Sequence, residues 1–236
     1  MAITSWSHSK LIEFEKCRYR TWLLHDQRIP EPARPLPQGK SEHANDRGTR
    51  IHQAAEDYVR GVRDDLIPEL EKFWGQLELL RVMYEDGLVS MEGEWALDKD
   101  WAPTEWNKGW HRSKVDVIVH HSKTHATVID YKSGRKFGNE VKHGEQMALY
   151  ALNAAVRFPE LLSITTELWY VDQDMVSTMV WPRHRAIASL PSYDKRGKAL
   201  TSNTDWAPNP NIYSCQWCMY GPWGTGHCTV GVKKQK

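Results

Sequence analysis

Several features that would identify other classes of protein are missing from this 236-residue sequence. No apolar run approaches the roughly 18 residues that a membrane-spanning helix needs, so we expect no membrane association. The N-terminal segment carries acidic residues where a secretory signal requires an apolar stretch, which predicts a cytoplasmic protein, or one of the host cytoplasm if the chain is viral. The glycine-rich phosphate loop GxxxxGK[ST] is also absent, and this excludes a helicase motor of that type.

Net charge is close to zero, because 31 lysines and arginines oppose 30 aspartates and glutamates. These charges are unevenly distributed along the chain. Residues 56–100 contain 13 acidic and 5 basic residues, whereas residues 108–142 contain 8 basic and 3 acidic ones. Such asymmetry can give one surface a positive field that attracts phosphate groups, although charge alone favours two ordinary solvated faces.

Cysteine is scarce, and its positions are informative. Cys17 lies near the start of the chain, and Cys215, Cys218 and Cys228 fall within 14 residues near its end. Disulfides are rare in cytosolic proteins, so a CxxC pair with a third cysteine nearby favours a metal site. Four thiolates can close a tetrahedral zinc site or hold an iron–sulfur cluster, and the spacing leaves both open.

The rest of the sequence, with 40% hydrophobic and 26% charged residues, is typical of a folded globular chain. Its periodicity predicts helices, then three strands, a further helix and two more strands, which is the order of one mixed α/β core with additions at both ends. Residues 28–40 carry four prolines and predict an extended connection. The expected helices cover residues 11–24, 47–62, 66–85 and 144–157, with a short one beyond 182. The expected strands cover residues 89–97, 114–120, 126–131, 165–171 and 176–181.

Two of these strands bring charged side chains together. The segments KVDVIV and VIDYKSG are separated by the short linker HSKTH, which is typical of an antiparallel hairpin. Pairing would place Asp116 near Asp130 and Lys132, and the last two share a face because they are two residues apart. Carboxylates suit Mg²⁺ or Mn²⁺, and the lysine can orient or activate a water. An exposed charged hairpin without a joint role is the simpler alternative.

Motifs on either side of the hairpin strengthen the first interpretation. GTRIH opens a helix upstream and offers His52, and Gln146 and Tyr150 of QMALY share one helix face downstream. In this order, GTRIH, VDVIV, DYKSG and QMALY resemble the GxxxH, Asp, DYKxG and QxxxY signature of the RecB-type nucleases of the PD-(D/E)xK superfamily. The resemblance implies a restriction-endonuclease-like α/β core, in which a mixed central sheet is flanked by helices.

The resemblance also implies a ligand set for a divalent cation. His52, Asp116, Asp130 and the Tyr131 carbonyl would bind Mg²⁺ or Mn²⁺, and Glu92 aligns loosely with a further acid of the family. For His52 alone, a packed helix histidine is the ordinary alternative, and the neighbouring motifs reverse that preference.

The same resemblance gives roles to residues that do not bind the cation. Lys132 would position the attacking water and stabilise charge on the phosphate. Gln146 and Tyr150 would hold the site or the DNA backbone. The basic residues that surround the site in sequence, and that could contact phosphates, are Lys108, Arg112, Lys114, Arg135 and Lys136.

The cysteines extend the resemblance to the iron–sulfur subgroup, which includes the CRISPR-associated nuclease and the AddB nuclease domain. It implies a 4Fe-4S cluster that ties the two chain ends beside the nuclease core, held by Cys17, Cys215, Cys218 and Cys228. The nine residues between the last two cysteines exceed the usual spacing, so zinc stays open. One nuclease domain over residues 1–236 is expected, with a helix and proline-rich connection (1–47), a core (48–181) and a cysteine segment (182–236).

Aromatic residues offer surfaces for unpaired bases. Four interleave with the C-terminal cysteines and would either stack on bases or only shield the cluster, namely Tyr213, Trp217, Tyr220 and Trp223. Packing is the more common use of the central tryptophans, which are Trp95, Trp101, Trp106 and Trp110.

Together these inferences predict a metal-dependent DNA nuclease, in first place an exonuclease acting on single-stranded ends in recombination, repair or DNA processing. A structure-specific endonuclease is one alternative. A non-catalytic DNA-binding or adaptor protein of CRISPR adaptation or recombination is the other, although an intact Asp116, Asp130 and Lys132 argue against it. The expected partners are DNA and, because no helicase motif is present, a helicase or a recombination or CRISPR adaptation protein.

Overall fold

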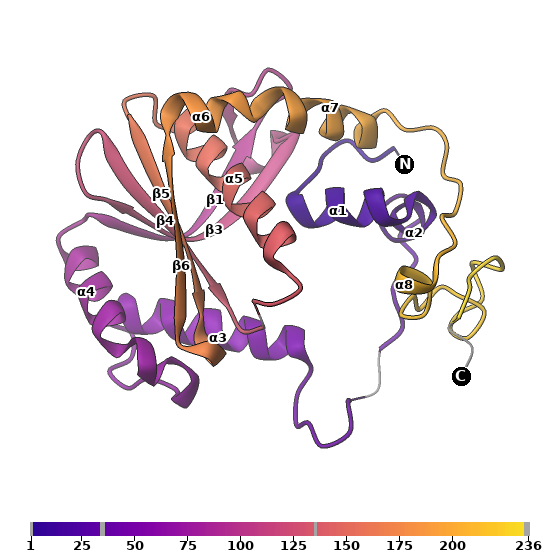
Figure 1. Ribbon diagram of the computed structural model, residues 1–236, viewed down its shortest axis with the longest axis horizontal. Helices are drawn as coiled ribbons and strands as arrows, with labels where there is room; N and C mark the ends of the chain where they lie inside the picture. The colour runs from indigo at the N-terminus through magenta and orange to yellow at the C-terminus, as the bar shows by residue number, and fades with distance from the viewer. Residues whose placement is uncertain (1, 34–35, 135, 234–236) are drawn as a thin grey trace. The chain divides into compact units, whose positions relative to one another are not determined.

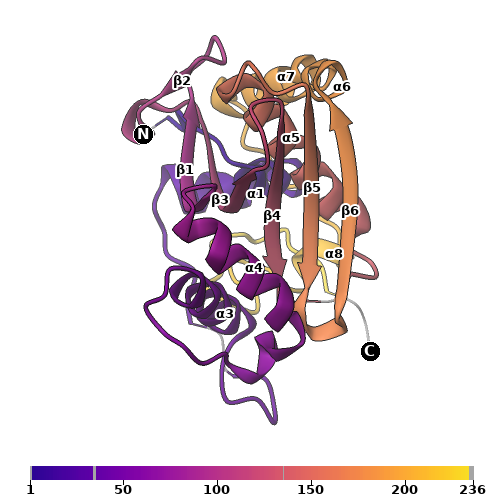
Figure 2. The ribbon, with the colours of Figure 1, turned by 90° about the vertical axis from the view of Figure 1, so that its left-hand side faces the viewer.

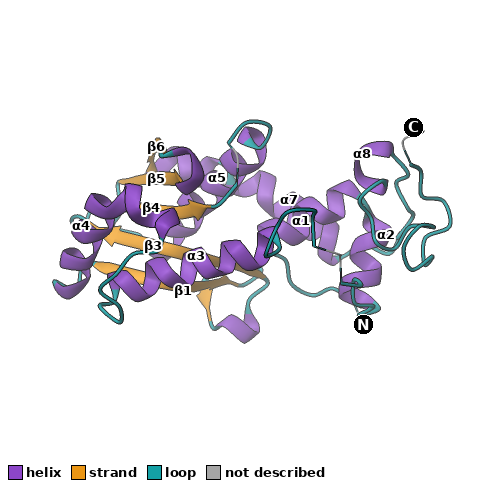
Figure 3. Ribbon diagram, turned by 90° about the horizontal axis from the view of Figure 1, so that it is seen from below, coloured by secondary structure: helices purple, strands orange, loops and turns teal. Residues whose placement is uncertain are grey.

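The computed structural model describes residues 2–33, 36–134 and 136–233, and the chain forms two compact units. Unit 1 comprises Met1–Pro35 and Ser192–Lys236, and unit 2 comprises Leu36–Pro191. Unit 2 contains the sheet, whereas unit 1 consists of short helices and long loops (Figure 1, Figure 3). Within the described ranges, no helix combines the length and the apolar character needed to cross a membrane.

A six-stranded sheet with the order β2-β1-β3-β4-β5-β6 forms the centre of unit 2. Its strands are β1 (Val89–Leu97), β2 (Pro103–Thr104), β3 (His111–His120), β4 (His125–Lys132), β5 (Ser163–Tyr170) and β6 (Met175–Pro182). Neighbouring strands are antiparallel except β4 and β5, which run parallel because helix α5 (Glu140–Arg157) connects them. This mixed sheet with flanking helices confirms the predicted fold class.

Helices cover both faces of the sheet (Figure 2). Helices α3 (Ala44–Val59) and α4 (Trp74–Glu85) belong to one core, where Ile51 and Leu77 are buried with Tyr131. Helix α5 belongs to the other core, where Met147 is buried with Val128. Strand β4 contributes to both cores, and residues 126–131 are all buried. A strand covered on both faces should be almost wholly apolar, so a buried aspartate within it stands out.

Two predicted helices differ from the structure. The helix expected over residues 11–24 is interrupted, because Cys17 is extended (φ −160°, ψ 105°) between α1 (His8–Lys16) and α2 (Arg18–Thr21), which continues as a π-helix over Trp22–Asp26. The helix expected over 66–85 begins as a 3-10 helix over Pro68–Phe73, with the proline in its first turn, and continues as α4. The short helix expected beyond 182 is present as α6 (Arg183–Ala188), and it is followed by α7 (Leu190–Thr201) and α8 (Ile212–Cys215).

The central tryptophans mostly serve packing. Trp95, Trp101 and Trp110 are buried, and the last two meet edge to face with ring centroids 5.8 Å apart. Trp106 is half-buried beneath the guanidinium of Arg112. Three of the four central tryptophans therefore pack in the interior, as the simpler interpretation predicts.

Candidate metal centre

The candidate site in unit 2 forms where β3 and β4 cease to pair. Their register runs as far as Val117 opposite Ile129. At the next position the buried Asp116 carboxylate accepts the Tyr131 backbone N–H at 2.8 Å. A side chain thus takes over a bond that the strand ladder would otherwise supply, and the second carboxylate oxygen faces helix α3.

Helix α3 presents His52 to this carboxylate. The ring Nδ1 lies 3.3 Å from Asp116 Oδ1, and Nε2 lies 3.0 Å from the Tyr131 carbonyl oxygen. Burial alone would lower the pKa of His52, but the hydrogen bond to Asp116 and the negative charge of that carboxylate outweigh it and raise the pKa to about 9. A ring that faces two acceptors donates from both nitrogens, so at neutral pH His52 carries a positive charge among carboxylates.

The start of α3 lies close to the loop that follows β4. Arg47 donates to the Ser133 carbonyl at 3.1 Å and pairs with both carboxylate oxygens of Asp172 at 2.7 and 3.0 Å. A Cβ on Gly48 would lie 3.4 Å from the Ser133 hydroxyl, so the helix and the loop are in van der Waals contact at this point. These contacts place the GTRIH segment beside the DYKSG segment, as the order of motifs predicts.

Glu92 on β1 completes a group of three ligands. Each of His52, Glu92 and Asp116 offers one ligand atom, and these atoms all lie within 4.8 Å of one another. Glu92 adopts φ +49°, which is strained for a residue with a side chain, and such strain concentrates at functional sites. Burial, together with the negative charges of Asp116 and Glu56, raises the pKa of Glu92. A cation would relieve this repulsion.

The donor set fits Mg²⁺ or Mn²⁺. Octahedral Mg²⁺ holds oxygen ligands at about 2.0–2.1 Å, so opposite ligands lie about 4.2 Å apart. A group whose ligand atoms lie within 4.8 Å needs only a small contraction to reach that spacing. One imidazole with carboxylates also suits Mn²⁺. The cation would replace the proton that gives His52 its charge, because a ligating imidazole must be neutral.

Asp130 and Lys132 lie side by side on β4, as their spacing predicts. Lys132 Nζ is 2.5 Å from Asp130 Oδ2, and the two side chains are only 19% and 3% exposed. Burial raises the pKa of Asp130, and the positive charge of Lys132 only partly offsets this. Three charged groups thus meet within one buried region, since Asp116 also raises the pKa of Asp130.

Helix α5 holds the lysine from the other side. Lys132 Nζ donates to Gln146 Oε1 at 3.0 Å, and Gln146 Nε2 donates to Asp130 Oδ1 at 3.2 Å and to the Tyr150 hydroxyl at 2.8 Å. Tyr150 in turn donates to the Lys114 carbonyl at 2.7 Å. Gln146 and Tyr150 thus both bond to residues of the hairpin, and the bond from Lys132 to Gln146 fixes the position of the lysine.

Two neighbours of the lysine are additional to the predicted site. Tyr170 lies opposite Lys132 in the β4–β5 register, and its hydroxyl is 2.9 Å from His143 Nδ1. Burial, and then the positive charge of Lys132, lower the pKa of His143 to about 4, so this imidazole is neutral at pH 7. His143 precedes Gln146 by three residues, and this helical spacing is the signal that would have found it.

The predicted phosphate contacts are spread over the surface of unit 2. Lys108 pairs with Glu105 at 3.1 Å and Lys114 with Glu94 at 3.4 Å, and both lysines are exposed. Two other predicted phosphate contacts bond within unit 2: Arg112 donates to the Asn107 carbonyl, and Lys136 donates to the sulfur of Met175. Arg135 lies outside the described residues.

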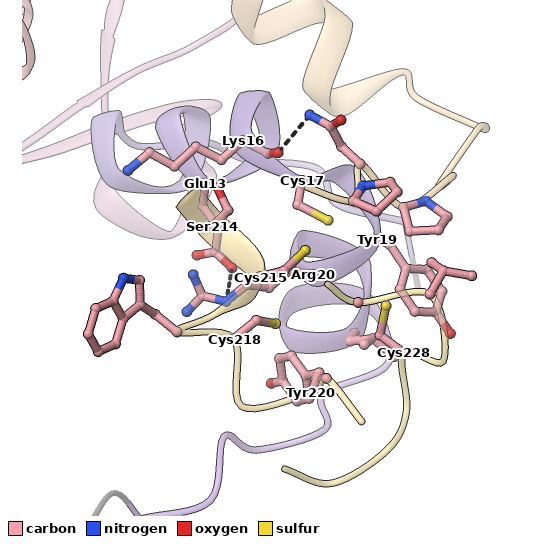
Figure 4. A pocket seen from close by; sticks show the side chains of 18 of the residues that line it. Glu13, Lys16, Cys17, Tyr19, Arg20, Ser214, Cys215, Cys218, Tyr220 and Cys228 are labelled. Atoms are coloured by element: carbon pink, nitrogen blue, oxygen red, sulfur yellow. Dashed lines mark hydrogen bonds and ion pairs between the residues drawn. The ribbon is translucent and has the colours of Figure 1, made fainter. Parts of the chain in front are cut away.

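A second candidate site lies within unit 1. All four cysteines line one pocket of about 260 Å³, and Figure 4 shows their sulfur atoms around a common space. Cys215 is buried, and the other three are half-buried. Burial raises the pKa of Cys218, and the thiols of Cys17 and Cys228 act in the same direction. The extended Cys17 between two helices brings an N-terminal thiol to three C-terminal ones.

The sulfur atoms are spaced more widely than a single zinc ion requires. A Zn–S distance of 2.3 Å in a tetrahedral site places the sulfurs about 3.8 Å apart. Among the described residues, which include all four cysteines, no three of these sulfurs lie within 4.8 Å of one another. The pocket as it stands is therefore too wide for one ion held by all four thiolates.

Comparison with known proteins finds a family model that matches most of the chain. The family model described as PD-(D/E)XK nuclease superfamily matches residues 5–223, which include every residue of the metal centre and three of the four cysteines. No curated protein matches significantly. Among solved structures, the crystal structure of SSO0001 is similar with a TM-score of 0.49 and 9% identity, over 99% of this chain and 90% of that chain.

Proposed function

The chain belongs to the PD-(D/E)XK nuclease superfamily, and from this premise we propose that it is a metal-dependent nuclease that hydrolyses phosphodiester bonds of DNA. The observation that carries the proposal is the convergence of His52, Glu92 and Asp116 next to the Asp130–Lys132 pair. Packing alone would not gather three acids, an imidazole and an ammonium at one end of a buried hairpin, because each buried charge is costly.

Each residue then has a defined task. His52, Glu92, Asp116 and Asp130, with the Tyr131 carbonyl, would hold Mg²⁺ or Mn²⁺. When bound, the cation supplies Lewis-acid stabilisation of the phosphate and lowers the pKa of a water.

Lys132 orients the attacking water and donates to the phosphate oxygen on which charge develops. Gln146 and Asp130 keep its ammonium in place, since both contact Nζ. Tyr150 accepts a hydrogen bond from Gln146 and donates one to the Lys114 carbonyl, and it thereby links helix α5 to strand β3 of the hairpin. The water oxygen forms a bond to phosphorus and gives up a proton to the solvent, while the bond from phosphorus to one sugar oxygen breaks and that oxygen takes up a proton.

We propose further that the four cysteines hold a 4Fe-4S cluster rather than zinc. A cluster of four irons is larger than one ion and therefore holds its thiolates farther apart, which suits the wide spacing of the sulfurs. The cluster would connect Cys17 to the segment Cys215–Cys228. Isolated hydrogen bonds also connect this segment to the N-terminal helices, such as the one from the Tyr19 hydroxyl to the His227 carbonyl at 3.0 Å. Its task within unit 1 is structural.

For the substrate, we propose single-stranded DNA with a free end, and hence an exonuclease. Exposed Tyr213 and Trp217 support this, because aromatic faces bind unpaired bases. Tyr220 is fully buried and donates to the Ile29 carbonyl at 2.5 Å, so it serves packing instead. On duplex substrates a helicase or a recombination or CRISPR adaptation protein would supply the free strand.

The proposal is tested by incubating 5′- and 3′-labelled DNA with the full chain in Mg²⁺ or Mn²⁺. We expect linear single strands to be shortened from one end, circular single strands to resist, and EDTA to stop the reaction. Equal digestion of circles would indicate an endonuclease. Binding without any cleavage in either metal would indicate the non-catalytic alternative and refute the proposed activity.

A further inference from the structure

The loop between β4 and α5 ends in a defined turn. Asn139 donates its backbone N–H to the Lys136 carbonyl at 3.0 Å, which closes a four-residue turn with Phe137 and Gly138 in the middle. Gly138 has φ +85°, the conformation that a type II turn requires at its third position. The turn therefore places Phe137 at its tip by backbone geometry.

Hydrogen bonds fasten this turn to the end of the sheet. The Lys136 backbone N–H donates to Gln173 Oε1 at 2.7 Å, and the Gly138 N–H donates to Glu140 Oε2 at 2.7 Å. Gln173 ends the short turn after β5, three residues beyond Tyr170, which lies opposite Lys132. The turn is thus attached just past the point where the sheet carries the proposed catalytic lysine.

The tip presents apolar surface to solvent. Phe137 is 71% exposed, and Val141, four residues later at the start of α5, is 80% exposed. Single exposed apolar residues are common and usually need no explanation. This case differs because the backbone is arranged to turn an aromatic ring outward, with the basic residues Lys136 and Lys142 on either side of it in sequence.

We propose that Phe137 stacks on an unpaired base of the nucleic acid and thereby positions the adjoining phosphate at the metal centre. The inference rests on the proposed nuclease function. It assigns to Phe137 the selectivity of the metal centre for single-stranded nucleic acid. A flat ring binds any base through its face, and a paired base within a duplex does not offer that face. The contact would therefore favour single strands without favouring a sequence.

The test compares Phe137→Ala and Phe137→Trp with a matched control, Leu162→Ala. Leu162 is 65% exposed and lies just before β5, where its N–H bonds to the Thr124 carbonyl at the opposite end of β4 from Lys132. Binding of the full chain to fluorescent single-stranded oligonucleotides is measured in EDTA, which keeps metal-dependent cleavage off. A second series carries one abasic nucleotide, moved stepwise along the strand. Thermal unfolding verifies that each variant is folded.

Because one stacked base is lost, Phe137→Ala should bind the single-stranded oligonucleotide about 5- to 150-fold more weakly than the wild type. Phe137→Trp and Leu162→Ala should bind as the wild type does. When the abasic nucleotide occupies the position of the stacked base, binding by the wild type should weaken by the same factor. On that strand, Phe137→Ala should bind as tightly as the wild type does.

Two results would overturn the inference. Binding by Phe137→Ala within twofold of wild type would show that the ring does not contact DNA. A loss that persists at every abasic position would show a contact with the backbone instead of a base. The proposed function fails separately if the wild type does not cleave the same oligonucleotides when Mg²⁺ or Mn²⁺ replaces EDTA, so the two failures are distinguishable.

Discussion

The charge on His52 makes the stability of the metal-free protein depend on pH in a predictable way. Its pKa is about 9 in the folded chain, against an ordinary value of 6.5. Because the folded state binds this proton more tightly, the contribution to stability is complete below pH 6.5 and is lost as the pH rises through 9. The difference between the two values corresponds to about 3 kcal/mol. This is an upper figure, since the side chain keeps 29% of its surface exposed.

The assay is urea unfolding in EDTA at intervals from pH 6 to pH 10, on the wild type and on His52→Gln. Glutamine keeps a donor but cannot take a proton. The free-energy difference between the two proteins should shrink by about 3 kcal/mol across this range. Glu92 and Asp130 also have raised pKa values, and the charge of His52 lowers both, so the comparison reports the His52 proton together with its effect on these two carboxyl groups. A difference that stays constant with pH would refute the reasoning, because it would mean that His52 is neutral in the folded chain.

Three further predictions concern the two candidate centres. Mg²⁺ binding at pH 7 should release close to one proton, measured by calorimetry in two buffers of different ionisation enthalpy, and no release would contradict ligation by His52. Glu92→Gly should weaken Mg²⁺ binding yet raise the stability of the metal-free protein by about 1 kcal/mol, because φ +49° suits glycine. Loss of stability with unchanged Mg²⁺ affinity would contradict this. Protein purified without oxygen should be brown, and Cys218→Ser should bleach and destabilise it; a colourless protein with one zinc would reject the cluster.

Much of the site follows from spacing. Asp130 and Lys132 are two residues apart on a strand, and Gln146 and Tyr150 are four apart on a helix, so elementary periodicity predicts which side chains share a face. The short HSKTH linker then brings Asp116 to the same end of the sheet. The structure joins Asp130, Lys132, Gln146 and Tyr150 in one set of hydrogen bonds. Asp116 lies beside them and accepts the backbone N–H of Tyr131. Their roles in catalysis stay predictions.

Other features depend on tertiary geometry that no local pattern encodes. Nothing in SMEGEW signals that Glu92 adopts a left-handed backbone and turns toward His52, because that conformation is imposed by its neighbours. Likewise, the helical pattern of residues 11–24 conceals the break at Cys17, which the cysteine pocket of unit 1 uses. The exposure of Phe137 also has no local sequence signal, because it depends on the turn around Gly138.

The central claim is that Lys132 and the metal ligands form a nuclease centre, and one comparison tests it most directly. Cleavage of end-labelled single-stranded DNA in Mg²⁺ is measured for the wild type, Lys132→Ala and Lys123→Ala. Lys123 is an exposed lysine in the β3–β4 turn, at the far end of β4 from the site, so its removal controls for general loss of positive charge. Lys132→Ala should lose cleavage by a factor of about 100 or more while it still binds DNA, because the lysine acts on the transition state. Lys123→Ala should cleave as the wild type does, and cleavage by Lys132→Ala at the wild-type rate would contradict the claim.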